Sequence, residues 1–346
     1  AYDGDQMARE LNMESKHSIE KQTAHYVDCF TTVSEITNNE CKELLDKPAD
    51  VILMNGFEDN FVPKGATFTN KCKRARSAML NVANKLLGTD WGDDTLIIGT
   101  SGRYEFKNKG IDVFLESLNR LSRDKNLKKN VLAFINVPGW VGEPRADLQE
   151  RLKSKNQFDT PLEVPYITHW LHNMSHDQVL DTMKYLDMAN RPQDKVKVIF
   201  VPCYLDGKDG IFNKEYYDVI LGQDLSVYAS YYEPWGYTPL ESVAFRVPTI
   251  TTDLAGFGLW VKSLKNQNGL DDGVEVIHRS DYNYSEVADE IKDTVSAYSG
   301  KTAKEIETIR KRAAAVAEQA LWKHFIQYYY EAYDIALRNA MKRQLS

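Results

Sequence analysis

YYEPWGYTPLESVAFRVPTITTDLAGFG, residues 231–258, is the stretch that decides the fold class of this chain. It carries two glutamates, Glu233 and Glu241, eight positions apart across a turn rich in proline, glycine and aromatic residues. The run LSVYAS before it predicts a buried strand, and TPLESVAFR predicts the first part of a helix. A strand, a tight turn and a helix N-terminus together present backbone N–H groups and the positive end of the helix dipole. The segment therefore predicts a phosphate-binding turn with a carboxylate for each end of a sugar nucleotide.

Strands and helices alternate on both sides of this segment. Short apolar runs rich in β-branched residues predict further strands at residues 49–55, 95–102, 131–138, 196–202 and 248–253. Helical periodicity covers residues 73–87 and 112–123. Such alternation predicts an α/β fold with a doubly wound, parallel, Rossmann-like sheet.

The C-terminal region, residues 303–341, predicts one long or broken helix. Trp322, Phe325, Tyr329 and Tyr333 fall at helical spacing and form an aromatic stripe. We expect this stripe to pack against the core rather than to bind a ligand.

Composition limits the possible partners and compartment. The 346 residues are 42% hydrophobic and 27% charged, with a formal net charge of -7. This balance is typical of a globular protein and argues against nucleic acid or an anionic membrane as a partner. The sequence contains neither a signal-peptide pattern nor an apolar run long enough to span a bilayer. Four cysteines without C-x-x-C spacing predict reduced thiols and a cytoplasmic protein: Cys29, Cys41, Cys72 and Cys203.

Two basic residues follow the predicted strand at 95–102. Arg103 and Lys109 lie just beyond its end, where a parallel sheet presents its ligand crevice. A guanidinium fork and a movable ammonium group can together stabilise a departing diphosphate without a metal. The alternative is a salt-bridged surface pair, but the neighbouring glycines favour phosphate binding.

The turn itself supplies the other candidate ligands. Glu241 can accept hydrogen bonds from both ribose hydroxyls, as the acidic residue of dinucleotide-binding folds does. Thr238 and the backbone N–H groups near Trp235, Gly236 and Tyr237 are placed to meet phosphate and sugar oxygens. From the residues alone, Glu233 has an alternative interpretation as an acid that caps the following helix.

Three histidines in HWLHNMSH, at positions 169, 172 and 176, superficially suggest a metal site. No carboxylate or cysteine completes a recognisable ligand set around them in sequence, so we predict no metal and no other cofactor.

Four segments carry a resemblance to a known family. They are FTTVSEIT at 30–37, MNGF at 54–57, GRYEFKNKGIDVFLESL at 102–118, and YYEPWGYTPLE followed by GFG within 231–258. In this order and spacing they resemble the donor-site signature of GT-B glycosyltransferases. The similarity is strongest to the eukaryotic-type glycogen synthases of glycosyltransferase family 3, and it runs over nearly the whole chain.

The resemblance implies a division of the chain. Residues 1–50 correspond to the tail of an N-terminal lobe, 51–302 to the nucleotide-sugar-binding Rossmann-like lobe, and 303–346 to a C-terminal helix that packs back toward the N-terminal lobe. Nothing in the chain matches the glycine-rich loop of the family's first lobe. We therefore expect a fragment that lacks most of that lobe, and a natural short protein is the alternative.

The implied activity is retaining transfer of glucose from UDP-glucose to the non-reducing end of an α-1,4-glucan such as glycogen. This chain would supply the donor-binding half and be inactive alone. By match to the family, Arg103 and Lys109 bind the phosphates, Glu233 contacts the transferred glucose, and Tyr216 stacks on uracil. An ADP-linked donor remains an alternative, as do a stand-alone nucleotide-binding lobe and another GT-B enzyme. An oligomer is possible.

Two departures from the family bear on phosphate binding. Asp224 occupies a position where the family has a histidine close to the phosphates, which puts one phosphate contact in doubt. The family's activating helix is arginine-rich, whereas residues 309–322 read IRKRAAAVAEQALW. Three adjacent cations remain there: Arg310, Lys311 and Arg312. We expect an enzyme without strong activation by glucose 6-phosphate and, since residues 146–169 are too short for a helical insertion, without the eukaryotic tetramer.

Overall fold

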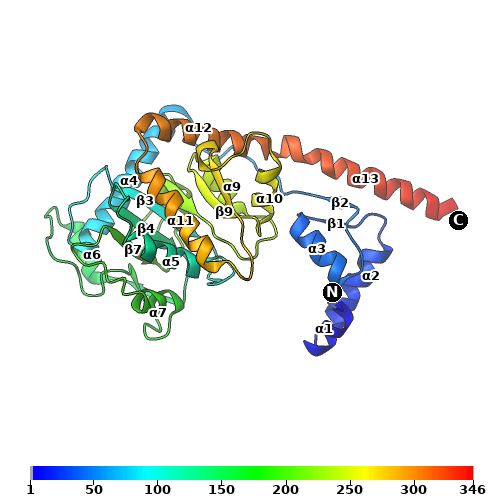
Figure 1. Ribbon diagram of the computed structural model, residues 1–346, viewed down its shortest axis with the longest axis horizontal. Helices are drawn as coiled ribbons and strands as arrows, with labels where there is room; N and C mark the ends of the chain where they lie inside the picture. The colour runs from blue at the N-terminus through cyan, green and yellow to red at the C-terminus, as the bar shows by residue number, and fades with distance from the viewer. Residues whose placement is uncertain (1–2, 346) are drawn as a thin grey trace.

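A six-stranded parallel sheet forms the centre of the larger body of the molecule (Figure 1). The computed structural model describes residues 3–345. The strand order is β10-β9-β8-β3-β4-β7. The strands are β3 (Leu96–Ser101), β4 (Val131–Asn136), β7 (Val196–Val201), β8 (Leu225–Val227), β9 (Thr249–Thr252) and β10 (Val274–Ile277). The order reverses between β3 and β8, so the carboxyl ends of these two strands flank the crevice where such sheets bind ligands. The predicted α/β fold with a doubly wound sheet is confirmed.

Both faces of this sheet are covered, which explains the continuous apolar runs of its central strands. Every residue of β3, β4 and β7 is buried. Helix α4 (Gly65–Leu87) packs on one face, where Met79 and Leu86 join Ile97 and Phe134 in a common core. Helices α5 (Ile111–Leu121) and α11 (Tyr284–Ser299) cover the other face.

Smaller elements complete this body. Strands β5 (Val141–Pro144) and β6 (His169–Leu171) form an antiparallel pair beside the carboxyl end of β4. The remaining helices are α6 (Ala146–Lys153), α7 (Gln178–Tyr185), α8 (Tyr216–Ile220), α9 (Tyr237–Ala244), α10 (Gly256–Ser263) and the short 3₁₀ helix η1 (Leu270–Asp272). The sequence patterns did not single out β10, α11 or most of these shorter elements.

The N-terminal elements lie apart from the large sheet (Figure 1). They are α1 (Gly4–Glu10), α2 (Glu14–Tyr26), β1 (Thr31–Thr32), α3 (Glu35–Leu44) and β2 (Val51–Ile52). The strand predicted at 49–55 is β2, and it pairs with β1 instead of joining the six-stranded sheet. Backbone and side-chain atoms of Asp50 both bond to Phe30, which sets the register of this pair.

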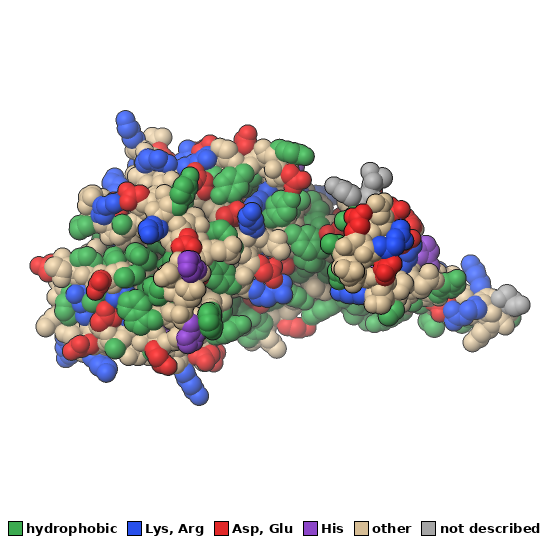
Figure 2. All heavy atoms as spheres, turned by 90° about the horizontal axis from the view of Figure 1, so that it is seen from below, with side chains coloured by type: hydrophobic (Ala, Val, Ile, Leu, Met, Phe, Trp, Pro, Cys, Tyr) green, Lys and Arg blue, Asp and Glu red, His purple; other side chains and the backbone are tan. Residues whose placement is uncertain are grey.

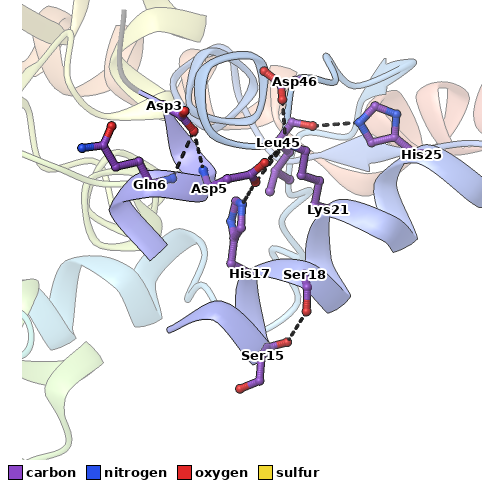
Figure 3. Close-up of polar contacts among 10 residues, drawn as sticks. All are labelled: Asp3, Asp5, Gln6, Ser15, His17, Ser18, Lys21, His25, Leu45 and Asp46. Carbon is purple, nitrogen blue, oxygen red and sulfur yellow. Dashed lines mark hydrogen bonds and ion pairs between the residues drawn. The ribbon is translucent and has the colours of Figure 1, made fainter. Parts of the chain in front are cut away.

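Charged side chains hold the N-terminal helices together (Figure 3). The Lys21 ammonium lies 3.0 Å from Asp5 and 2.6 Å from Asp46, so it links α2 to α1 and to the end of α3. His17 Nε2 lies 2.7 Å from the Asp5 carboxylate. The hydrogen bond from His17, with Lys21, holds the pKa of Asp5 below its ordinary value. These carboxylates are exposed, so solvent and salt screen the pairs.

The C-terminal region forms two helices, α12 (Ala303–Gln319) and α13 (Trp322–Leu345). The chain breaks between them because the Ala320 carbonyl accepts a bond from Phe57 N–H, while Trp322 N–H donates to the Phe57 carbonyl. Helix α13 then runs back past β2, and Asn339 donates a 2.8 Å bond to the Asp28 carbonyl (Figure 1). The predicted aromatic stripe faces the core only in its first half, since Phe325 is buried whereas Tyr333 is 56% exposed.

None of the helices in residues 3–345 combines the length and the apolar character that crossing a bilayer demands.

Candidate active site

Two loops meet at the carboxyl ends of β3 and β8. Residues 102–110 follow β3, and residues 228–236 follow β8. Their backbones are in direct contact, because Tyr231 N–H donates a 2.8 Å bond to the Asn108 carbonyl. Gly110 has φ +68°, and a Cβ there would lie 1.8 Å from the Ala229 carbonyl oxygen. This close approach requires glycine and brings the predicted basic loop against the predicted acidic turn.

Lys109 and Glu233 form an ion pair across these loops. The side chains are 14% and 16% exposed, so the pair is largely shielded from solvent. The Glu233 backbone is held by a 3.1 Å bond to the Leu254 carbonyl and by a bond that its own carbonyl accepts from Gly256. Glu233 is therefore not a helix cap, and α9 has no side-chain cap at all. The structure brings together one predicted phosphate ligand and the predicted sugar-contacting carboxylate.

The N-terminus of α9 presents unused backbone donors beside this pair. Gly236 is the N-cap residue with φ +114°. Across residues 3–345 no acceptor is found for the N–H groups of residues 235–238. The Trp235 ring is buried against Phe257, Trp260 and Phe325, so only its backbone faces the site, whereas Tyr237 is 45% exposed. Free donors at the positive end of a helix form an anion-binding cradle.

A pocket of about 350 Å³ opens next to this cradle. The side chain of Arg103 is 76% exposed and lies 3.0 Å from Glu105, so it can turn toward a ligand. The pocket is lined by residues from the ends of several strands and from α8 and α9, among them Arg103, Asn136, Pro138, Tyr204, Tyr216 and Thr238. Arg103, Tyr216 and Thr238 therefore line one cavity.

The Tyr216 hydroxyl belongs to a chain of hydrogen bonds beneath the pocket. It lies 2.7 Å from the Ser101 hydroxyl, which lies 3.3 Å from the Tyr228 hydroxyl. Tyr228 in turn contacts the Ser242 hydroxyl at 2.7 Å. Burial raises the pKa of Tyr216 well above its ordinary value, so the phenol stays neutral. This network fixes the ring of Tyr216 at the pocket wall.

Glu241 lies in the second turn of α9, and the Tyr217 hydroxyl donates a 2.9 Å bond to its carboxylate. Burial raises the pKa of Glu241, and the bond from Tyr217 lowers it in part. The bond from Tyr217 fixes the position of the carboxylate. Glu241 does not itself line the 350 Å³ pocket.

Comparison with known proteins identifies the family. The sequence model described as "Glycogen synthase" matches residues 1–155 and 145–346, which together cover the whole chain. The chain belongs to the glycogen synthase family. It is 28% identical to the glycogen [starch] synthase of Neurospora crassa, over 98% of this chain and 56% of that protein. It is 29% identical to isoform 2 of Saccharomyces cerevisiae, over 99% and 57%.

This glycogen synthase family member spans a little over half the length of the curated relatives that it matches. Among solved structures it is similar to Anabaena Alr3699/HepE, described as a complex with UDP and glucose. The TM-score is 0.50 at 14% identity, over 90% of this chain and 63% of that one. At this identity the likeness concerns the fold.

Sequence reasoning missed several pocket residues of this family member. Asn136 and Pro138 come from the end of β4, and Cys203 and Tyr204 come from the end of β7. Their one signal in the sequence is their position directly after apolar runs, which marks the crevice side of a parallel sheet.

The interpretation of Asp224 as a residue near the donor phosphates was wrong. Asp224 precedes β8, at the amino end of the sheet, whereas Arg103 follows the carboxyl end of β3. Its carboxylate accepts a 2.8 Å bond from Arg76 and contacts Arg310 at 3.3 Å. Asp224 therefore belongs to a cluster with two arginines at the amino ends of the strands, opposite the candidate active site.

The three-histidine group considered in the sequence is not the group that the fold assembles. His169, Cys203 and Asp209 offer ligand atoms within 4.8 Å of one another. Both ring nitrogens of His169 are already hydrogen-bonded, to the Thr168 hydroxyl at 2.8 Å and to the Asp209 carbonyl at 2.7 Å. Burial raises the pKa of Cys203 to about 12, so the thiol keeps its proton. These groups are committed to internal contacts, which does not favour a metal.

Proposed function

We propose that this chain is the donor-binding half of a retaining glucosyltransferase. The reaction is transfer of glucose from UDP-glucose to the non-reducing end of an α-1,4-glucan such as glycogen, with most of the other lobe supplied from outside this chain. Membership of the glycogen synthase family supports the proposal. The observation that carries it is the Lys109–Glu233 pair beside the free N–H groups at the N-terminus of α9.

The geometry suits departure of a diphosphate. We place the base in the pocket and the phosphates against Arg103, Thr238 and the α9 cradle, with the ribose toward Glu241, which lies outside the pocket lining. Lys109, at the meeting of the two loops, adds positive charge as negative charge develops on the leaving group. Two cations and several backbone donors supply this stabilisation, so we propose that the reaction needs no metal or other cofactor.

Glu233 then lies next to the sugar end of the donor. Its backbone is held on both sides, and its carboxylate is kept in place by Lys109. A positioned carboxylate can hold glucose hydroxyls and stabilise the positive charge of an oxocarbenium-like transition state. We assign Glu233 this electrostatic and positioning role.

The direct test uses the chain of residues 1–346. We expect calorimetry to detect weak binding of UDP, and an assay with radiolabelled UDP-glucose and glycogen to detect no transfer. Robust transfer by this chain would overturn its assignment as a donor-binding half. Failure to bind UDP would overturn the donor site itself.

The raised pKa of Glu241 predicts a pH dependence of UDP binding. The ribose hydroxyls need an ionised acceptor, so affinity should fall as pH decreases through the pKa of Glu241, which burial raises.

The same burial affects stability, because Glu241 holds its proton more tightly in the folded state than in the unfolded state. Glu241 thus lowers stability as pH rises from the unfolded pKa to the folded one. Glu241→Gln should bind UDP more weakly at neutral pH and lose this dependence, whereas an unchanged profile would contradict the ribose assignment.

Regulation by a sugar phosphate should be weak. Arg310 contacts Asp224 at 3.3 Å, Arg312 contacts Asp272 at 3.2 Å, and Lys311 contacts Glu307 at 3.6 Å. A doubly charged phosphate would have to compete with these carboxylates for each of the three cations. We expect glucose 6-phosphate to raise the activity of a glucose-transferring form of the protein by less than about tenfold, or roughly 1.4 kcal/mol of coupling. Larger activation in a paired assay would contradict this prediction.

We further propose a cytoplasmic location, which the four free thiols support. The proposed partners are UDP-glucose and the glucan. The face shown in Figure 2 intersperses acidic and basic side chains, and this pattern supports no role for nucleic acid or an anionic membrane. Apolar side chains gather where the N-terminal elements meet the body that contains the six-stranded sheet (Figure 2). The proposal is compatible with an oligomer.

A further inference from the structure

Asn136 is the last residue of β4 and lines the 350 Å³ pocket. In the sheet it pairs with Ser101 of β3 and Val201 of β7. The residue is 6% exposed. Neither its side-chain oxygen nor its side-chain nitrogen has a hydrogen-bond partner within residues 3–345.

The other buried asparagines of the described chain are satisfied. Asn190 accepts a 2.9 Å bond from Val198 N–H and donates to the Val198 carbonyl at 2.7 Å. Asn38 accepts a 2.9 Å bond from Ala49 N–H and donates to Glu35. A buried amide without a partner destabilises a fold, so its presence at a pocket indicates a partner that arrives with a ligand.

We propose that Asn136 hydrogen-bonds the edge of the uracil base of the donor nucleotide. This inference rests on the proposed donor function and adds the residue that reads the base. With the phosphates at Arg103 and Thr238, the base shares the pocket with Asn136, Pro138 and Tyr204, which all line it. Uracil presents an N–H donor beside a carbonyl acceptor, and an asparagine amide offers the complementary acceptor and donor. Because both amide atoms are buried, contact with that edge requires the Asn136 side chain to change rotamer.

The test compares a nucleotide with a ligand that has no base. Calorimetry on the full chain measures UDP and inorganic pyrophosphate binding to the wild type and to Asn136→Leu, which has a similar volume but no amide. We expect UDP affinity to fall about tenfold or more, the size of one lost hydrogen bond of about 1.4 kcal/mol. Pyrophosphate affinity should stay within about twofold. The melting temperature should rise, because an unsatisfied buried amide has been removed.

A matched control and a specificity variant sharpen the result. Asn126 is exposed and lies outside the pocket, so Asn126→Leu should leave UDP affinity unchanged. Asn136→Asp accepts hydrogen bonds but cannot donate, so it should disfavour UDP and improve CDP relative to UDP, since cytosine presents an amino donor.

Unchanged UDP affinity in Asn136→Leu overturns the inference while leaving the donor site intact. An equal loss of UDP and pyrophosphate also overturns it, because Asn136 would then act only through the shape of the site. Failure of the wild-type chain to bind UDP overturns the proposed function and this inference together, and is recognised before any variant is made.

Discussion

Arg103→Ala and Lys109→Ala should each remove about 2–4 kcal/mol of transition-state stabilisation from glucose transfer. Arg103 and Thr238 line the same pocket, and Lys109 is paired with Glu233 at the junction of the two loops. In the proposed function, each cation acts on charge that develops during departure of the diphosphate. The loss should therefore appear in kcat as well as in KM.

The measurement is kcat and KM for UDP-glucose in a form of the protein that carries this chain and transfers glucose. Lys107 is the matched control, because it is an exposed lysine in the same loop and does not line the pocket. Lys107→Ala should leave kcat/KM within about twofold. A change of less than about threefold in kcat/KM for Arg103→Ala or Lys109→Ala would remove that residue from the leaving-group site.

Gly110→Ala should destabilise the chain by about 2–6 kcal/mol, from left-handed backbone strain together with a steric clash. Its φ is +68°, and the added Cβ would lie 1.8 Å from the Ala229 carbonyl oxygen. Relief of that clash requires the two loops to separate, which also moves Lys109 away from Glu233. We therefore expect weaker UDP binding in whatever fraction remains folded.

Gly65→Ala provides the comparison for this variant. Gly65 has φ +58°, but nothing lies within 4 Å of its added Cβ, so it reports backbone strain alone at about 1 kcal/mol. Urea denaturation of both variants separates the two contributions. Equal destabilisation by Gly65→Ala and Gly110→Ala would show that the steric clash between the loops adds nothing to the loss in free energy of unfolding.

Much of the candidate site could be read from residue type and position. Glu233, Arg103 and Lys109 stand next to glycines or prolines directly after predicted strands, where the crevice of a parallel sheet lies. Asn136 carried no comparable signal, because a polar residue at the end of an apolar run is usual at any strand end. The lack of hydrogen-bond partners for its side-chain amide follows only from the positions of all its neighbours in the tertiary structure.

Asp224 illustrates an error with a physical cause. The resemblance matched its position to a histidine close to the phosphates, but a short strand separates it from the turn at 231–236. Residues before and after one strand of a parallel sheet lie at opposite ends of its strands, so they belong to opposite sides of the molecule. Arg76 and Arg310, which contact Asp224, are 148 and 86 positions away in the chain, so local reasoning could not find them.

The sequence by itself determined the fold class and the positions of most strands of the large sheet along the chain, and it predicted which segments bind phosphate. Apolar runs, helical periodicity and glycine-rich turns act over a few residues, and these local signals suffice for such conclusions. Only the tertiary structure decided that Lys109 pairs with Glu233, that β2 joins β1 instead of the large sheet, and that Asn136 is left without a partner. Each of these depends on contacts between distant segments, and those contacts are set by packing of the whole chain rather than by the residues on either side.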